Sequence, residues 1–167
     1  YKFVTLDDYT VNANSYNNTV TFSNLTIKQG EPVSLTFTHD VATNPSATFE
    51  IPDADVDTSS ITTIVQQSTT NSYSQVFTLA QEFLDLMPST TSYFLQEGPN
   101  GNYQIYFGDG ILGKSLTDGN VVLLSYIKSS GISATGANTF VLMDSISGYS
   151  NTVVTGVSSA IQGSDKE

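Results

Sequence analysis

The 167-residue sequence contains no cysteine, no arginine and no tryptophan. Without cysteine, the chain can form neither a disulfide framework nor a thiolate metal site. Without arginine, it has no bidentate clamp for a carboxylate or phosphate and no arginine finger for phosphoryl transfer. These absences remove several common kinds of binding and catalytic site.

Positive charge is also scarce, because sixteen acidic residues face five lysines and the formal net charge is −11. Such a chain would repel a nucleic acid rather than bind it through counterion release. No apolar run approaches the roughly 18 residues of a membrane span. We therefore expect neither a nucleic acid nor a membrane as partner. With only 13% charged residues, the polar surface is mostly Ser, Thr, Asn and Gln, which suits a packed protein partner.

Alternation of polar and apolar residues predicts a mainly β (α+β) fold, with antiparallel hairpins, a meander and one or two short helices. Two hairpins are expected, one from residues 19–27 and 33–38 and one from residues 93–96 and 102–107. A further expectation is that the loop after residue 107 joins neighbouring strands of the meander. The other expected strands cover residues 47–51, 61–66, 74–79 and 120–128, with weaker ones at 140–143 and 153–157.

One segment has a helical pattern. Leu79, Phe83, Leu86 and Met87 lie at i, i+4, i+7 and i+8, which places them on one face of a helix. Pro88 would end this helix after about two turns. The pattern predicts a short helix that packs into the core.

Residues 108–115 read GDGILGKS and fit the phosphate-cradling pattern G-x-x-x-x-G-K-[ST]. Such a loop needs a strand before it and a helix after it. Residues 102–107 alternate as a strand should, but the β-branched run at 121–127 leaves no room for a helix. We therefore interpret Lys114 as a solvated loop charge. Positive φ in a compact loop explains the glycines at 108, 110, 113 and 119.

Asp53, Asp55 and Asp57 have the D-x-D-x-D spacing that begins a calcium-binding loop. The sixth position is not glycine, and the twelfth is Ile64 rather than glutamate. The three aspartates are thus weak candidates for metal ligands, and we expect no metal site. An acidic turn, in which Asp57 or Thr58 accepts local N–H groups, explains the segment better.

Candidate catalytic groups are few. His39 and Asp40 are adjacent, but neighbours on a strand point to opposite faces, and no G-x-S-x-G motif supplies a nucleophile. Glu82 with Asp85, or Asp53 with Asp55, could form a carboxylate pair, but a sugar cleft usually also offers stacking aromatics, and tryptophan is absent. We expect a chain that is not an enzyme and has no cofactor.

Several segments together resemble the baseplate J-like family, whose members build the tail baseplates of contractile phages. The resemblance is carried by SYFLQE at 92–97, NYQIYFGDGILGK at 102–114, GNVV at 119–122 and SY at 125–126. Within that family, the likeness is nearest to the large baseplate wedge subunits of T-even-type myoviruses. It covers residues 49–126 well and the first 45 residues poorly.

The resemblance implies a structural subunit of a baseplate wedge, assembled in the host cytoplasm and located in the tail baseplate of the virion. Its partners would be other copies of itself, as a dimer or ring, and other wedge proteins. The family carries no catalytic residue. The residues matching its motif would determine the fold: Phe107, Gly108, Asp109, Gly110, Gly113, Gly119, Asn120 and Tyr126.

The expected organisation has three parts: an N-terminal hairpin region at 1–46, a baseplate J-like β core at 47–130 and a C-terminal β segment at 131–167 that leads to a helical domain. Because the chain starts at Tyr1 and ends in GSDKE, we expect a piece of a longer protein. Strand edges near 19–27 or 153–157 are expected contact sites. The acidic, cysteine-free, Ser/Thr-rich composition equally fits an alternative, a β-rich surface adhesion or carbohydrate-binding module.

Overall fold

The computed structural model describes residues 1–5, 8–12, 14–17, 20–22, 25–82, 84 and 86–145. The fold is mainly β, with 40% of the described residues in strands and 3% in helices. The described elements are nine strands and one short 3₁₀ helix. Their bounds are β1 Phe3–Thr5, β2 Ile27–Gln29, β3 Glu31–Thr38, β4 Thr48–Glu50, β5 Val56–Gln66, β6 Ser74–Leu79, β7 Ser92–Glu97, β8 Tyr103–Phe107, β9 Val121–Lys128 and η1 Gly131–Ala134.

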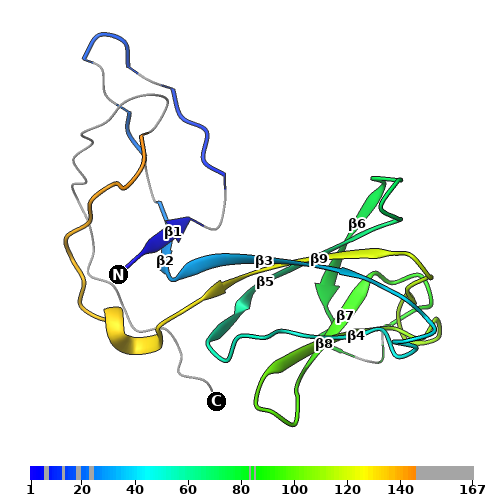
Figure 1. Ribbon diagram of the computed structural model, residues 1–167. Helices are drawn as coiled ribbons and strands as arrows, with labels where there is room; N and C mark the ends of the chain where they lie inside the picture. The colour runs from blue at the N-terminus through cyan, green and yellow to red at the C-terminus, as the bar shows by residue number, and fades with distance from the viewer. Residues whose placement is uncertain are drawn as a thin grey trace.

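The strands form two sheets, a small one of β1 and β2 and a seven-stranded one in the order β3-β9-β5-β6-β7-β8-β4. All described pairings are antiparallel except that between β6 and β7. Figure 1 shows β3, β9 and β5 running side by side, with β7, β8 and β4 in a second group beside them. β1 and β2 lie at the start of β3.

The large sheet curls over on itself, because side chains from its two edge strands meet. The rings of Phe37 in β3 and Phe49 in β4 have centroids 5.2 Å apart. Phe107 contacts Phe49 edge-on at 6.0 Å and Phe77 at 5.4 Å. Offset and edge-on contacts of this kind add stability beyond the buried area. The aromatic side chains therefore fill the space between the two groups of strands. The most deeply buried side chains are Ile51, Ile105, Leu124, Val122 and Thr63.

Several sequence predictions are confirmed. β6 has the predicted bounds 74–79, and β7 and β8 form the predicted hairpin. The tight turn between them places Gly101 at φ 76°, and the N–H of Gly101 donates to the carbonyl of Gly98 at 3.0 Å. β5 was predicted only over 61–66, whereas it begins at Val56.

The predicted hairpin of 19–27 with 33–38 is wrong. β3 pairs along its whole length with β9, while β2 pairs with β1. Gly30 joins β2 to β3 without reversing the chain, with φ 145°. Its N–H donates to the carbonyl of Lys2 at 2.9 Å. Of residues 19–26, the described ones lie outside strands, and 19, 23 and 24 lie outside the described residues.

The predicted helix over 79–87 is also wrong for the residues that the structure describes there, 79–82, 84, 86 and 87. Leu79 ends β6, where it pairs in parallel with Tyr93. The segment after it returns to the start of β7 through a turn in which Met87 and Thr90 bond to each other. A parallel pair needs such a crossover connection, and here it is built from irregular chain.

The expected meander breaks after β8, because β8 and β9 are not neighbours in the sheet. β9 lies between β3 and β5, so the glycine loop crosses from one group of strands to the other. Near the C-terminus, Val141 forms an isolated bridge where a strand over 140–143 was predicted. The predicted strand at 153–157 lies outside the described residues. No helix in the described part of the chain is long and apolar enough to cross a membrane.

Candidate functional site

The glycine loop at 108–115 contains four of the eight residues predicted to determine the fold, and its geometry is tight. A Cβ on Gly108 would lie 2.4 Å from the carbonyl carbon of Gly113, closer than packed atoms allow. Gly110 and Gly113 have φ of 88° and 86°, and the N–H of Gly110 donates to the carbonyl of Gly113 at 3.1 Å. Gly110 and Gly113 thus provide positive φ, whereas Gly108 is needed for space. The expectation of positive φ at Gly108 is wrong.

The side chain of Asp109 stabilises this loop by accepting hydrogen bonds from its backbone. Its Oδ1 accepts the N–H groups of Ile111 at 2.8 Å and Leu112 at 2.9 Å. These backbone hydrogen bonds, that of Leu112 foremost, hold the pKa of Asp109 below its usual range. Amides that would ring a phosphate in a nucleotide-binding loop are therefore occupied by a carboxylate of the chain itself.

Lys114 differs from the solvated charge that we expected. It is half-buried, and its Nζ donates to Oε1 of Gln75 on β6. After Ser115 the chain continues without a helix to β9 at Val121. Neither the lysine nor the following segment is placed to contact a bound phosphate as in a nucleotide-binding loop.

The glycine loop contacts the crossover connection between β6 and β7. The N–H of Lys114 donates to the carbonyl of Thr90 at 2.8 Å, and Thr90 Oγ1 accepts the N–H of Met87 at 3.0 Å. On these two bonded loops, four large apolar side chains face solvent: Leu84 is 96% exposed, Ile111 71%, Met87 66% and Leu112 45%. We call the last three the loop patch.

The remaining motif residues support the connection before β9. Asn120 Oδ1 accepts the N–H of Thr117 at 2.8 Å, and its Nδ2 donates to the carbonyl of Gln67 at 2.9 Å. Gly119, at φ 81°, donates its N–H to the carbonyl of His39 at 2.9 Å. Phe107 is a buried core residue. These contacts fix the end of β3 against the start of β9.

His39 and Asp40 do not form an acid–base pair. His39 is buried edge-on against Phe49, and its Nδ1 has no hydrogen-bond partner. Asp40 is exposed, and its Oδ1 accepts the N–H of Ala42 at 2.8 Å. Of the two carboxylate pairs, Glu82 with Asp85 includes a residue outside the described ones. In the other, Asp53 is bonded to Lys128 and Tyr126.

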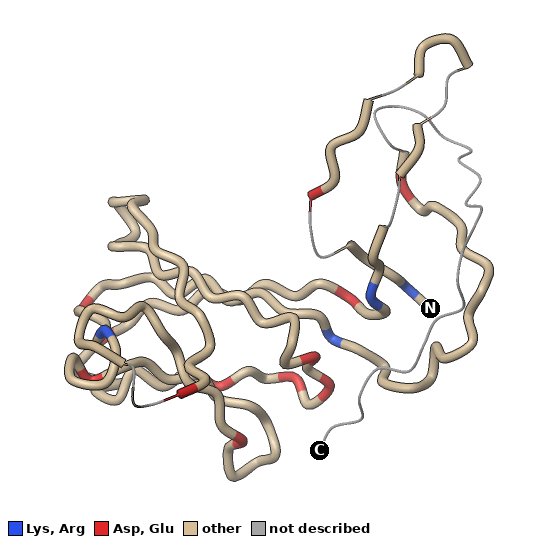
Figure 2. The backbone as a smooth tube through the Cα atoms, turned by 180° about the vertical axis from the view of Figure 1, so that it is seen from behind, with Lys and Arg blue, Asp and Glu red and all other residues tan. Residues whose placement is uncertain are grey.

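Three of the four described lysines lie at the junction of the two sheets (Figure 2). Each of the three is paired with an acid. Lys128 bonds Asp53 at 2.5 Å, and Lys28 bonds Asp57 at 3.0 Å. Lys2 lies 3.6 Å from Glu31 and is well exposed. The acidic segment 53–57 thus provides partners for lysines of β2 and β9.

Tyr126 and Asp53 form a second polar link at this junction. The Tyr126 hydroxyl donates to Oδ2 of Asp53 at 2.5 Å. Bonds from Lys128 and from this hydroxyl hold the pKa of Asp53 below its usual range. Burial and the Asp53 carboxylate raise the pKa of Tyr126. The neutral tyrosine and the ionised aspartate are therefore both favoured in the folded state.

Asp53, Asp55 and Asp57 do not converge on a common point. No group of three or more potential metal-ligating side chains is found among the described residues. Asp57 accepts the N–H of Ser59 at 3.0 Å, as the interpretation of an acidic turn predicted. With Asp53 and Asp57 each bonded to a lysine, the segment is organised for ion pairs rather than for a cation.

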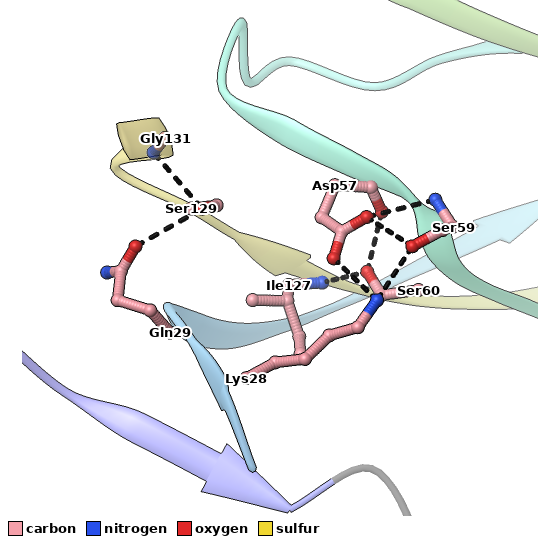
Figure 3. Close-up of polar contacts among 8 residues, drawn as sticks. All are labelled: Lys28, Gln29, Asp57, Ser59, Ser60, Ile127, Ser129 and Gly131. Atoms are coloured by element: carbon pink, nitrogen blue, oxygen red, sulfur yellow. Dashed lines mark hydrogen bonds and ion pairs between the residues drawn. The ribbon is translucent and has the colours of Figure 1, made fainter. Parts of the chain in front are cut away.

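Sequence reasoning missed the cluster shown in Figure 3. Opposite Ile127 of β9, β5 carries a large bulge, since the register jumps from Asp57–Ile127 to Thr62–Ser125. Ser60 in the bulge accepts the N–H of Ile127 at 2.8 Å and donates to the carbonyl of Asp57 at 2.6 Å. A serine hydroxyl thus replaces the missing ladder carbonyl. No sequence signal marks this role.

Lys28 and Ser59 have the short separation of a serine–lysine dyad, 2.7 Å from Nζ to Oγ. However, Oγ of Ser59 donates its proton to Oδ1 of Asp57 at 2.6 Å, and Oδ2 of Asp57 bonds the same lysine. The serine proton is therefore directed to the carboxylate, and the lysine Nζ donates to both groups instead of accepting from the serine. The geometry is that of a structural network.

No family model matches the chain, and no curated protein matches it either.

Proposed function

We propose that the chain is a structural subunit of a contractile-phage tail baseplate wedge and acts through protein–protein interfaces. The observation that carries the proposal is the loop patch. The residues that match the baseplate J-like motif build a loop held by Asp109 and by the Gly108–Gly113 contact, and this loop exposes Ile111 and Leu112. Exposed apolar side chains on a rigid support are typical of protein contact surfaces.

The charge distribution supports the same role. The described lysines are engaged within the chain, so the acidic side chains dominate the charge presented outward. A wedge partner would pack apolar groups on the loop patch and place basic or neutral groups around it. The proposed location is the virion baseplate, with other wedge proteins and further copies of this chain as partners.

Immunogold electron microscopy tests the location. Antibodies against this chain would be applied to intact particles of the source phage and to particles whose baseplates have been disrupted. We expect gold at the distal plate, at least after disruption. Serum pre-absorbed with the purified chain is the control. Absence of specific label from both preparations would contradict the proposal.

A second candidate, carbohydrate binding, is favoured by one observation. A shallow cavity of about 280 Å³ lies beside β5 and β6, and Tyr73 at its border is 65% exposed. An exposed aromatic ring next to amides and hydroxyls is a suitable surface for a neutral sugar. The polar lining residues are Gln67, Gln75, Lys114, Ser115, Thr117 and Asn120.

A glycan array distinguishes the two candidates. Binding by the chain that is lost in Tyr73→Ala and kept in Tyr1→Ala would favour the carbohydrate module over the wedge subunit. Tyr1 is a matched control because its side chain is also exposed, at 78%, and lies outside the cavity.

A further inference from the structure

The edge strand β3 of the large sheet is unusually long and almost uncharged. β3 spans eight residues, Glu31–Thr38, and no described residue pairs with it on the side away from β9. On a chain with a formal net charge of −11, residues 32–38 carry no charged side chain. Long edge strands normally carry charges, bulges or cover that prevent pairing with another chain.

Hydrogen-bonded and non-bonded residue pairs alternate along the sheet, and we call this alternation its hydrogen-bond phase. The phase identifies which backbone groups of β3 point away from β9. The N–H of His39 donates to the carbonyl of Asn120, so this pair is hydrogen-bonded. In an antiparallel ladder bonded and non-bonded pairs alternate. The odd-numbered residues of β3 therefore bond β9, and Ser34, Thr36 and Thr38 direct their N–H and C=O groups outward.

Two observations support this phase independently. The N–H of Gln67 donates to the carbonyl of Tyr73, so β5 turns its odd-numbered residues toward β6 and its even-numbered ones toward β9. β9 then has its even-numbered residues left for β3, as the phase requires. Pro32, which lacks an N–H, falls at an outward position, where proline is tolerated in an edge strand.

We propose that this free edge of β3 pairs with the β3 edge of a second copy of the chain, antiparallel and with Thr36 opposite Thr36. In this register Ser34 meets Thr38 of the other copy. Each outward N–H then finds an outward C=O, and Pro32 lies just outside the pairing. The inference deepens the proposed function and rests on it for its biological meaning, since it names the surface through which copies associate.

The side chains of β3 also favour a second copy of the chain as the partner of this edge. Val33, Leu35 and Phe37 are half-buried on the core face of β3 and continue the apolar core toward the edge. In the Thr36-centred register, Leu35 of one copy lies beside Phe37 of the other, which covers both. Because residues 32–38 are neutral, the pairing brings no like charges together despite the acidity of the chain.

A cysteine scan tests the register directly, because the chain has no cysteine of its own. Paired residues of a bonded antiparallel pair have Cα atoms about 5.5 Å apart, within the span of about 4.4–6.8 Å that a disulfide bridges. We expect Thr36→Cys to form a covalent dimer under mild oxidation. Thr78→Cys, which replaces another exposed threonine, on β6, should remain monomeric.

Mixtures fix the register. Ser34→Cys mixed with Thr38→Cys should cross-link, and each alone should not. Thr36→Lys, which sets two ammonium groups opposite each other, should weaken self-association in sedimentation by about tenfold, while Thr78→Lys should not. A chain that remains monomeric at all concentrations, or Thr36→Cys that cross-links no faster than Thr78→Cys, would overturn the inference.

The two proposals fail separately. Gold label at the baseplate without Thr36→Cys cross-linking would leave the wedge role standing and remove the β3 pairing. Thr36→Cys cross-linking without gold label at the baseplate would leave the β3 pairing standing and remove the wedge role. The Thr36→Lys variant could be missing from particles although copies of the chain never pair with each other. That result would show that the β3 edge binds a different protein, and it would overturn the inference that a second copy binds there.

Discussion

Gly108 and Gly113 approach each other so closely that a Cβ on Gly108 would lie 2.4 Å from the carbonyl carbon of Gly113. The obstacle is backbone, which cannot move aside as a flexible side chain could. This contact, and not a turn conformation, is what requires glycine at the start of the motif loop. Directly after Gly113, the N–H of Lys114 donates to the carbonyl of Thr90 and links the loop to the crossover connection that carries Met87.

We expect Gly108→Ala to destabilise the fold by about 3 kcal/mol, because the added methyl group overpacks the loop. Gly119→Ala is the control, since its φ of 81° is unfavourable for alanine but nothing lies within 4 Å of its added Cβ. The control should lose only about 1 kcal/mol, the cost of a left-handed residue. Urea unfolding measures both, and equal losses would contradict the steric argument.

Ser60 and Ser59 are neighbours with different roles, which makes them a matched pair. Ser60→Ala leaves the buried N–H of Ile127 without its acceptor and should cost about 1–3 kcal/mol. Ser59→Ala removes contacts at an exposed position and should cost less than about 1 kcal/mol. In hydrogen exchange, the Ile127 amide should lose protection only in Ser60→Ala. Equal effects of the two substitutions would show that the bulge does not depend on this hydroxyl.

Acid should weaken the fold through the aspartates at the sheet junction. Burial raises the pKa of Asp57, but hydrogen bonds from Ser59 and Lys28 outweigh it, and the resulting pKa lies below the usual 3.8. A lowered folded pKa stabilises the protein above the unfolded value, and this stability is lost as the pH falls through the folded value. We expect the free energy of unfolding to fall below about pH 4.

The comparison of two variants isolates Asp57 from the general effect of acid. Asp57→Asn should be less stable at pH 7 and should show a shallower loss between pH 5 and pH 3, since one linked proton is removed. Asp8→Asn removes the same charge from an exposed position and should follow the wild-type profile. If both variants lose stability in parallel with the wild type, the pair with Lys28 contributes nothing.

Alkali should act through Tyr126. Its pKa is raised by burial and by Asp53, so its folded value lies above the ordinary 10.0. The stability that this group contributes is present below pH 10 and is lost as the pH rises toward the folded pKa. Tyr126→Phe should cost about 1–2 kcal/mol at pH 7 and should flatten the loss above pH 10. An unchanged alkaline limb in this variant would contradict the assignment.

The loop patch should contribute to contacts with other proteins and little to stability. Ile111→Ser should leave the unfolding midpoint within about 0.5 kcal/mol of the wild type, as expected for a surface position. It should impair incorporation of the chain into assembling baseplates. Val76→Ser, 63% exposed on β6, is the control that should assemble normally. Normal incorporation of Ile111→Ser would remove the loop patch as the observation behind the wedge proposal.

Local patterns in the sequence predicted most strands of the fold. Strict alternation located β6 and β8, and the Gly98–Gly101 turn joined β7 to β8 correctly. The pattern failed where it had to choose partners. Residues 33–38 alternate equally well whether they pair with a preceding segment or with β9, more than eighty positions away. Period-two alternation gives the buried face of a strand but not its neighbour.

The false helix has a related cause. Leu79 and Met87 fit one helical face by spacing, but Leu79 is already committed to the ladder with Tyr93. In the candidate site, positive φ at Gly110 and Gly113 could be predicted from local composition. The roles of Lys28 and Ser60 could not, since both act across a bulge whose partners are far away in the sequence.

The parallel junction between β6 and β7 has a mechanical consequence. Only two residue pairs, Thr78–Ser92 and Leu79–Tyr93, hold the four-stranded and three-stranded halves of the sheet together along the ladder. Force applied along these strands would load the two pairs in shear, while the longer antiparallel ladders on either side share their load over more bonds. The seam between the halves is therefore the line along which the domain should yield first. The edge-on ring contact between Phe77 of β6 and Phe107 of β8 also joins the two halves.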